Sequence, residues 1–338
     1  MFNVVLADPP EPYYLEWMQA ALPDGMELAV PPPGDEMALY ALVREADFLL
    51  TRKRFIGREL IRAGKHLRLI QQFGLTRDLV DLAAAREVGI PVAGMPLAGA
   101  MAVAELVMTL LLALSKNLRR AHEATADGEY RKLGLEPKTT SQSSIAFQWM
   151  RLPAVEVYGK TLGIVGLGEI GLETARRARA FRMRIVYHKR KRLPEERERA
   201  WGASYRLLDD LLRESDFVSL SVPHTQETDR LIGKRELDLM KPSAFLINTC
   251  RGGVVDEDAL YQVLAAGRIA GAGLDVFRKE PLPAESPLAH LENVILTPHI
   301  GGGSGEPNLI QEVHDVLENV ARVANGEHPW YVETIPLR

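Results

Sequence analysis

The feature that most constrains this chain is a glycine pattern in its middle, where an apolar run ends and a helical pattern begins. The segment TLGIVGLGEIG carries Gly166, Gly168 and Gly171 in the spacing G-x-G-x-x-G. Glycines so placed permit a tight turn, the approach of a pyrophosphate to the backbone, and close packing of helix on strand. The phosphate would lie at the positive end of a helix starting near Glu169. We interpret the segment as a dinucleotide site; the alternative is a glycine-rich turn without a ligand.

Short apolar runs alternate with helical patterns on both sides of this motif, which is typical of parallel sheets covered on both faces. The 338 residues also exceed what a single core usually holds. We therefore expect an α/β protein with two doubly wound parallel-sheet domains, Rossmann-like and flavodoxin-like, and a cleft between them. The first expected strands are 2–7, 26–30, 47–51, 67–73 and 90–94. The later ones are 161–165, 184–187, 216–222, 244–249 and 271–276, with helices at 169–180 and 257–266.

The segments that join and follow the two arrays suggest how the domains divide. One long apolar helix is expected at about 98–123, and the polar stretch 125–148 after it is interpreted as an inserted loop. The apolar residues of 308–324 follow a helical period, so this last helix could return to the first array. We expect a discontinuous substrate domain, 1–98 with 300–338, and a dinucleotide-binding domain, 99–299.

Composition narrows the partners and the compartment. The formal net charge is only -4, which gives no field that would favour nucleic acid or an anionic membrane. Cys250 is the only cysteine, so an intrachain disulfide and thiolate metal clusters are excluded, and no metal site is expected. The N-terminus lacks the pattern of a signal peptide, and the apolar stretch 98–114 contains Glu105 and is interpreted as a buried helix. We expect a cytoplasmic protein without membrane contact.

The end of the strand after the glycine motif bears on the choice of cofactor. An acidic residue there would hold the ribose 2′-hydroxyl of NAD. This chain instead has the basic run His188, Lys189, Arg190, Lys191 and Arg192, and no carboxylate before Glu195. Arginine can bind the 2′-phosphate of NADP with two parallel hydrogen bonds. NADP(H) is favoured and NAD(H) remains possible; the alternative is a solvated basic turn balanced by Glu195, Glu196 and Glu198.

Several further segments together resemble one family. They are VDLAAAREVGIPVAGMP, AVAELVMTLLLAL, GKTLGIVGLGEIG, LINTCRGGVVDEDAL, GAGLDVFRKEPLP and NVILTPHIGG. In this order they resemble the D-isomer-specific 2-hydroxyacid dehydrogenases, which include phosphoglycerate dehydrogenases, glyoxylate/hydroxypyruvate reductases and phosphite dehydrogenase. The resemblance implies hydride transfer between NAD(P)(H) and C2 of a small 2-hydroxy or 2-oxo acid, in a homodimer formed mainly through the cofactor domain.

The resemblance also implies three catalytic residues. Arg251 would bind the substrate carboxylate, because a planar guanidinium matches a carboxylate and stays charged. His299 would be the acid/base that donates a proton to the carbonyl oxygen as hydride reaches C2. Glu280 would orient the ring of His299 and favour its protonated form.

Other contacts are implied residue by residue. Asp275 is assigned to cofactor positioning near the nicotinamide. The remaining expected cofactor contacts are Val103, Gly166, Gly168, Glu169, Ile170, Gly171, His188, Lys189, Arg190, Val222, Pro223, Thr228, Thr249, Cys250 and Gly301. The expected substrate contacts, besides Arg251, are the backbone at Phe73, Gly74 and Leu75 and the side chain of Arg52. If Arg52 and Arg54 face the substrate, a distal anionic group on it becomes plausible; a solvated loop is the alternative for both.

The sequence departs from the family at 76–78, at 96–100 and in the longer segment 130–158, so it does not single out one substrate. Three other readings stay open. One is phosphite-type oxidation on the same scaffold. The second is a cofactor-sensing co-repressor or scaffold, and the third is a domain pair that binds a nucleotide without chemistry.

Overall fold

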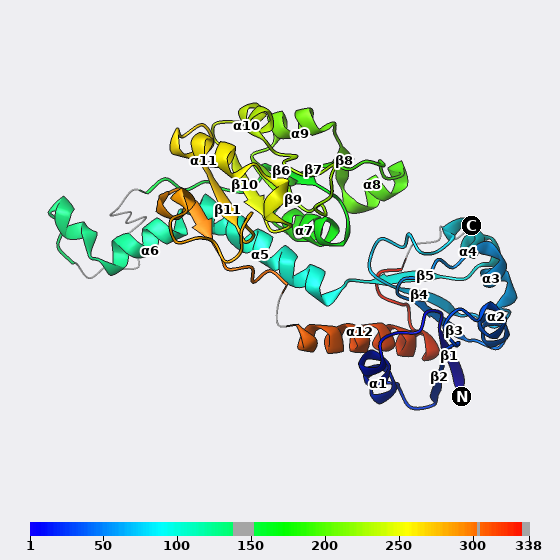
Figure 1. The fold of residues 1–338 in the computed structure, drawn as a ribbon. Helices are drawn as coiled ribbons and strands as arrows, with labels where there is room; N and C mark the ends of the chain where they lie inside the picture. The colour runs from blue at the N-terminus through cyan, green and yellow to red at the C-terminus, as the bar shows by residue number, and fades with distance from the viewer. Residues whose placement is uncertain (138–151, 303–304, 333–338) are drawn as a thin grey trace. The chain divides into compact units, whose positions relative to one another are not determined.

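The computed structural model describes residues 1–137, 152–302 and 305–332, which form two compact units (Figure 1). Unit 1 comprises Met1–Ala102 and Gly302–Arg338, and unit 2 comprises Val103–Gly301. The division expected from the sequence has its boundaries at 98/99 and 299/300.

Unit 1 is built on a parallel sheet of five strands in the order β2-β1-β3-β4-β5. With the strands numbered along the chain this is the flavodoxin-like order, in which ligands bind beyond the carboxyl ends of the strands. The sheet is almost wholly buried at its centre. Its strands are β1 (Phe2–Leu6), β2 (Met26–Ala29), β3 (Phe48–Thr51), β4 (Leu69–Phe73) and β5 (Val92–Met95).

Helices cover both faces of this sheet. One face carries α1 (Pro12–Ala20) and α12 (Glu306–Ala324), and the buried residues Val313, Val316 and Leu317 of α12 pack in the same cluster as the strands. The last helix therefore completes the core of the N-terminal segment. The other face carries α2 (Glu36–Arg44), α3 (Arg58–Ala63) and α4 (Leu82–Val88).

Unit 2 is built on a parallel sheet of seven strands in the order β12-β11-β10-β9-β6-β7-β8. The order reverses beside β6, which is the switch point at which a dinucleotide crosses a Rossmann sheet. Figure 1 shows α9, α10 and α11 on one side of this sheet and α7 on the other. The strands are β6 (Thr161–Val165), β7 (Arg184–His188), β8 (Ala203–Tyr205), β9 (Phe217–Leu220), β10 (Phe245–Asn248), β11 (Gly271–Leu274) and β12 (Val294–Leu296).

The helices of unit 2 follow the predicted pattern closely around the glycine motif. Helix α7 spans Glu169–Ala180, as expected, and α11 spans Glu257–Ala265 with the Asp256 side chain accepting from the Ala259 amide at its start. The same part of the chain, from 161 to 301, also contains α8 (Glu195–Trp201), α9 (Leu208–Glu214) and α10 (Lys234–Leu239), with 3-10 turns η2 (Gly252–Val254) and η3 (Pro287–His290).

The single helix expected at 98–123 is wrong. Two helices occupy the region, α5 (Ala98–Ser115) and α6 (Leu118–Ala126), and Asn117 between them is left-handed with φ 51°. Asparagine tolerates this conformation better than most residues, so it can end one helix and start another. The inserted loop expected at 125–148 is also partly helical, since the 3-10 helix η1 spans Glu129–Leu133. Residues 138–151 of it lie outside the described residues.

Helix α5 is the one described helix long and apolar enough to cross a membrane by length and composition. More than half of it is buried inside the protein, and Gly273 of β11 lies directly beneath Leu110 and Leu114. This burial matches the core helix expected from the sequence.

Candidate active site

The three glycines of the turn between β6 and α7 differ in the space around them: one has room for a side chain and the other two do not. Gly166 has φ +97°, and a side chain there would overlap the carbonyl oxygen of Ser221; a side chain on Gly171 would overlap the carbonyl oxygen of Gly166. A side chain on Gly168, by contrast, would meet no atom within 4 Å. The open glycine sits at the N-cap of α7, where backbone amides face a phosphate in this class of turn. The geometry fits a pyrophosphate.

Two buried hydroxyls that follow neighbouring strands of this sheet have no hydrogen-bond partner among the described residues, and the first belongs to a residue beside Gly166. They are Oγ of Ser221, just after β9, and Oγ1 of Thr249, just after β10. Buried polar groups without a partner are uncommon and call for an explanation such as a bound ligand. Thr249 was expected from the sequence, whereas Ser221 was missed because a serine after a strand belongs to no recognised motif.

The basic run after β7 divides into residues with different surroundings. Nζ of Lys189 donates to the carbonyl oxygen of Leu167, inside the glycine turn, over 3.3 Å, while Arg190 and Lys191 are exposed. Arg192 is instead paired with Glu198. The alternative of a turn balanced by glutamates therefore holds for Arg192, whereas Lys189 contacts the glycine turn.

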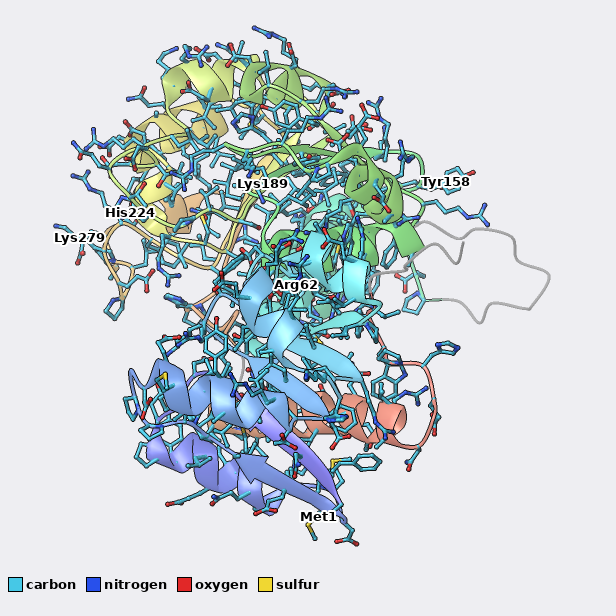
Figure 2. The ribbon with its side chains drawn as sticks, turned by 90° about the vertical axis from the view of Figure 1, so that its right-hand side faces the viewer. Met1, Arg62, Tyr158, Lys189, His224 and Lys279 are labelled. Atoms are coloured by element: carbon cyan, nitrogen blue, oxygen red, sulfur yellow. The ribbon has the colours of Figure 1, made fainter. Side chains whose placement is uncertain are left out.

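Other expected cofactor contacts lie at the same edge of unit 2, where Lys189, His224 and Lys279 mark three loops that follow strands (Figure 2). In the loop after β9, the Thr228 hydroxyl donates to the Pro223 carbonyl over 2.6 Å and accepts from the Thr225 amide over 2.8 Å. These bonds shape the loop that contains Val222. Nδ1 of His188 lies 3.0 Å from the carbonyl oxygen of Arg206.

The three expected catalytic residues follow three consecutive strands of one sheet. Arg251 comes shortly after β10, Glu280 after β11 and His299 after β12. The strands are parallel neighbours, so their carboxyl ends share an edge and their loops meet. The sequence motifs indicated the residues, and the topology explains why they converge.

His299 and Glu280 form a direct pair, with Nδ1 of the imidazole 2.5 Å from Oε2 of the carboxylate. Burial by itself would raise the pKa of Glu280. The hydrogen bonds from the His299 ring and the Phe277 amide, together with the charge of Arg251, outweigh burial and hold that pKa below its usual range. Glu280 is thus an anion that orients the ring and leaves Nε2 of His299 directed elsewhere.

Asp275 anchors the loop that carries His299. One carboxylate oxygen accepts from the Thr297 hydroxyl over 2.7 Å and the Ile300 amide over 2.9 Å, and the other accepts from the Gly301 amide over 2.9 Å. The support matters because His299 itself has φ 55°, a left-handed conformation that is uncommon for residues other than glycine. These contacts make Asp275 a positioning residue; its expected contact with the cofactor remains a prediction. Val103 lies next to Gly301 in the same corner.

Arg251 is exposed and is held by a bond from Nη1 to the carbonyl oxygen of Cys250 over 2.6 Å. The glycines after it leave no room for larger residues. A side chain on Gly252 would overlap the backbone of Phe277, and one on Gly253 would meet the His224 ring at 2.6 Å. Cys250 is buried, which raises the pKa of its thiol. A nucleophilic role for this thiol is therefore not favoured.

The expected substrate residues of unit 1 lie at the carboxyl ends of β3 and β4. Gly74 has φ +106°, and its amide donates to the Met95 carbonyl over 2.7 Å, so it offers close backbone approach rather than a free amide. The guanidinium of Arg52 lies 3.6 Å from the ring centroid of Tyr14 and pairs with Glu11 over 3.3 Å. Its side chain is only 16% exposed, whereas Arg54 is paired with Glu36. The solvated-loop alternative therefore does not hold for Arg52.

Within the described residues no group of three or more His, Cys, Asp or Glu side chains is arranged to hold a metal ion. A Rossmann sheet with an open glycine turn and a histidine–carboxylate pair at the same edge fits the class of nicotinamide-dependent oxidoreductases.

Comparison with known proteins identifies the family. Residues 108–301 match the model of the D-isomer specific 2-hydroxyacid dehydrogenase, NAD binding domain. A glyoxylate reductase of Thermococcus gammatolerans is 42% identical over 293 residues, which cover 86% of this chain and 84% of that protein. The chain belongs to the D-isomer-specific 2-hydroxyacid dehydrogenase family.

Solved structures agree with this assignment. The crystal structure of a glyoxylate reductase from Paecilomyes thermophila matches with a TM-score of 0.55 and 31% identity over 97% of both chains. An acyclic imino acid reductase in complex with NADPH and D-Arg matches with a TM-score of 0.53 and 27% identity, over 98% of this chain and all of that one. The protein is an NAD(P)-linked dehydrogenase that transfers hydride between the nicotinamide and a 2-oxo or 2-hydroxy acid.

Proposed function

We propose that this enzyme reduces a small 2-oxo acid at C2 with NADPH, using His299 as the proton donor, Glu280 as its partner and Arg251 as the carboxylate-binding residue. The observation that carries the proposal is the 2.5 Å contact between His299 and Glu280 in loops that follow neighbouring strands. The anionic carboxylate orients the ring through Nδ1, so that Nε2 is the atom that can donate a proton to the substrate.

The roles follow from the chemistry of each side chain. The nicotinamide supplies the hydride when the cofactor is bound. Arg251 binds the substrate carboxylate with its planar fork and orients the keto group. His299 donates its proton to the carbonyl oxygen, so negative charge does not build up on that atom. Oxidation of the 2-hydroxy acid uses the same residues in reverse.

Glyoxylate is the substrate favoured first, because the relatives with 42% identity are glyoxylate reductases. In this proposal the backbone at Phe73, Gly74 and Leu75 contacts the substrate. Arg52 adds a cation that is held in place by Tyr14 and Glu11. A substrate with a distal anionic group would use that cation and should be turned over as well as glyoxylate, or better.

The preference for NADPH rests on Lys189 and Arg190. Lysine cannot accept a hydrogen bond from a ribose 2′-hydroxyl, whereas a lysine and an arginine together can neutralise a 2′-phosphate. The bond from Lys189 to Leu167 keeps that cation against the nucleotide turn. Lys189→Asp combined with Arg190→Ala should shift the preference toward NADH, mainly through the cofactor KM.

We further propose a homodimer assembled through unit 2. Leu118 and Leu133 of the segment α6–η1 are more than half exposed, and this segment extends away from the sheet (Figure 1). A cavity of about 380 Å³ at the end of α5 is lined by Leu118, Phe245 and Ile295, among others. An apolar surface of this kind is typical of an isologous contact. Light scattering that gives the monomer mass at assay concentration would contradict it.

The test of the proposed function is a substrate panel. Glyoxylate, hydroxypyruvate, pyruvate, phenylpyruvate, 3-phosphohydroxypyruvate and phosphite are each assayed with both cofactors, in the direction each requires. Turnover of a 2-oxo acid with a higher kcat/KM for NADPH is expected. Turnover of phosphite alone would replace the substrate class, and cofactor binding without any turnover would favour a sensing or scaffold role in a cytoplasmic protein.

A further inference from the structure

The loop after β7 is fixed at both ends. At its start, Lys189 is bound to the carbonyl oxygen of Leu167 in the glycine turn. At its end, the Leu193 amide donates to the hydroxyl of Tyr187 over 2.9 Å. Tyr187 belongs to β7 and its side chain is fully buried. A residue of the strand that leads into the loop therefore also binds the far end of the loop.

Tyr187 shares its hydroxyl with a carboxylate on the following helix. It donates to Oε1 of Glu198 over 2.7 Å, and Glu198 accepts two further bonds from Arg192, at 2.9 Å from Nε and 2.8 Å from Nη2. The bonds from Arg192, assisted by the one from Tyr187, outweigh burial and hold the pKa of Glu198 below its usual range. Glu198 is ionised at neutral pH.

The ring of Tyr205 on β8 completes this arrangement. It packs edge-on against Tyr187, with 5.6 Å between ring centroids, and the Arg192 guanidinium lies 5.8 Å from its centroid. Arg192 is thus held beside α8 by its bidentate ion pair with Glu198 and beside β8 by the ring of Tyr205. Arg190, two residues earlier, is exposed and its charge helps, after a Thr225 hydrogen bond, to lower the pKa of Glu227.

We propose that Tyr187 and Glu198 are positioning residues for cofactor selection. They hold the Lys189–Leu193 loop so that Lys189 and Arg190 meet the 2′-phosphate. This inference rests on the proposed preference for NADPH. Both side chains are buried and bonded to protein atoms, so their effect passes through the loop.

The direction in which Glu198→Gln changes the affinity for a 2′-phosphate separates a positioning role from a direct electrostatic effect. Glu198→Gln removes a negative charge near the expected phosphate, so through-space attraction alone would strengthen binding of a 2′-phosphate. A loop released by loss of the bidentate pair would weaken it. The two accounts predict opposite changes for the same variant.

The experiment measures binding of adenosine 2′,5′-bisphosphate and of AMP to the whole enzyme by calorimetry, with KM and kcat for NADPH and NADH. In Glu198→Gln and in Tyr187→Phe, affinity for the bisphosphate and 1/KM for NADPH should each fall about 5-fold, the effect of about one hydrogen bond. Affinity for AMP, KM for NADH and kcat should not change.

Two controls match these variants. Glu195→Gln removes the same charge from the same helix and breaks no hydrogen bond of the network, since Glu195 pairs with Arg199 and acts on Arg192 only through its charge. Tyr205→Phe removes a neighbouring phenol hydroxyl and keeps the ring. Both should bind the bisphosphate at least as well as the unmodified enzyme. If Tyr187→Phe fails to fold, Arg192→Lys at an exposed position replaces it as the second variant. Lysine keeps the charge but cannot form the bidentate pair with Glu198, so affinity for the bisphosphate should fall as in Glu198→Gln.

The outcomes are distinct. Unchanged or stronger binding of the bisphosphate in Glu198→Gln overturns the positioning inference while leaving the NADPH preference intact. An unmodified enzyme that binds the bisphosphate no better than AMP, with equal kcat/KM for both cofactors, overturns the preference and the inference together. Loss of AMP binding in the variants would show a general defect of unit 2 and would also overturn the inference.

Discussion

At the scale of single residues, the proposed chemistry depends on one imidazole whose surroundings are fixed. Nδ1 of His299 is bound by Glu280, and the backbone around it is held by both oxygens of Asp275. The ring can therefore present Nε2 in one orientation. Proximity of this kind lowers the entropic cost of proton transfer.

His299→Ala should remove most turnover, by about 10²- to 10⁴-fold, because the proton donor acts in the transition state. Cofactor binding should persist, since the glycine turn lies at another part of the sheet edge. Steady-state kinetics and cofactor titration measure the two effects. His290→Ala, at an exposed histidine of η3, is the control and should keep normal kcat. A near-normal kcat in His299→Ala would contradict the proposed role.

Glu280→Gln should lower kcat about 10-fold, the effect of losing one charge-assisted hydrogen bond. The pKa of Glu280 is held below its usual range, so at neutral pH the residue is an anion that accepts from the His299 ring. The glutamine amide carries no charge, so the ring should be held less firmly in the orientation that presents Nε2. Glu285→Gln, an exposed residue of the same segment, should keep normal kcat in steady-state kinetics. A near-normal kcat in Glu280→Gln would show that the carboxylate does not position the ring.

At the scale of elements, the β6–α7 turn shows three glycines with different reasons for their presence. Gly166 and Gly171 are required by the protein's own packing and, for Gly166, by a positive φ. Gly168 has open space on the side where a side chain would project. The protein itself therefore does not require a glycine there, whereas a ligand would.

Alanine at these two positions should separate folding from binding. Gly166→Ala should lower the free energy of unfolding by about 2 kcal/mol or more, because of strain and overlap with the Ser221 carbonyl. Gly168→Ala should unfold at nearly the same temperature but bind the cofactor about 10-fold more weakly, a loss typical of disturbed backbone contacts to phosphate. Thermal unfolding and cofactor titration measure both. Unchanged cofactor affinity in Gly168→Ala would show that the open side is not the phosphate site.

Secondary structure was largely predictable from the sequence, because a segment with a clear apolar period indicates by itself whether it forms a helix or a strand. Helix α7 was expected at its observed bounds, and ten strands were placed within a few residues. The failures have local causes. Strands β8 and β12 have three residues each, too few for a period to emerge. The break between α5 and α6 depends on a single left-handed Asn117 in a sequence that otherwise favours helix.

At the scale of the whole molecule, the parallel topology brings together residues that are far apart in the sequence, because the loops that follow neighbouring strands lie at the same edge of the sheet. Arg251, Glu280 and His299 could be found from motifs because each follows a strand of the same sheet. Contacts between side chains of different elements could not be found from motifs. The Tyr187–Glu198–Arg192 network joins a strand, a loop and a helix through residues that form no motif. Ser221 was missed for the same reason.

The central claim is that hydride passes from NADPH to C2 of a 2-oxo acid, and isotope transfer tests it most directly. NADPH carrying deuterium at C4 of the nicotinamide, with each face labelled in turn, is incubated with the enzyme and glyoxylate, and glycolate is examined by mass spectrometry and NMR. One deuterium at C2 of glycolate is expected for each NADPH oxidised, from one labelled face only. Glycolate that carries no deuterium with either labelled face, or no oxidation of NADPH with glyoxylate or any other 2-oxo acid of the panel, would contradict hydride transfer to C2.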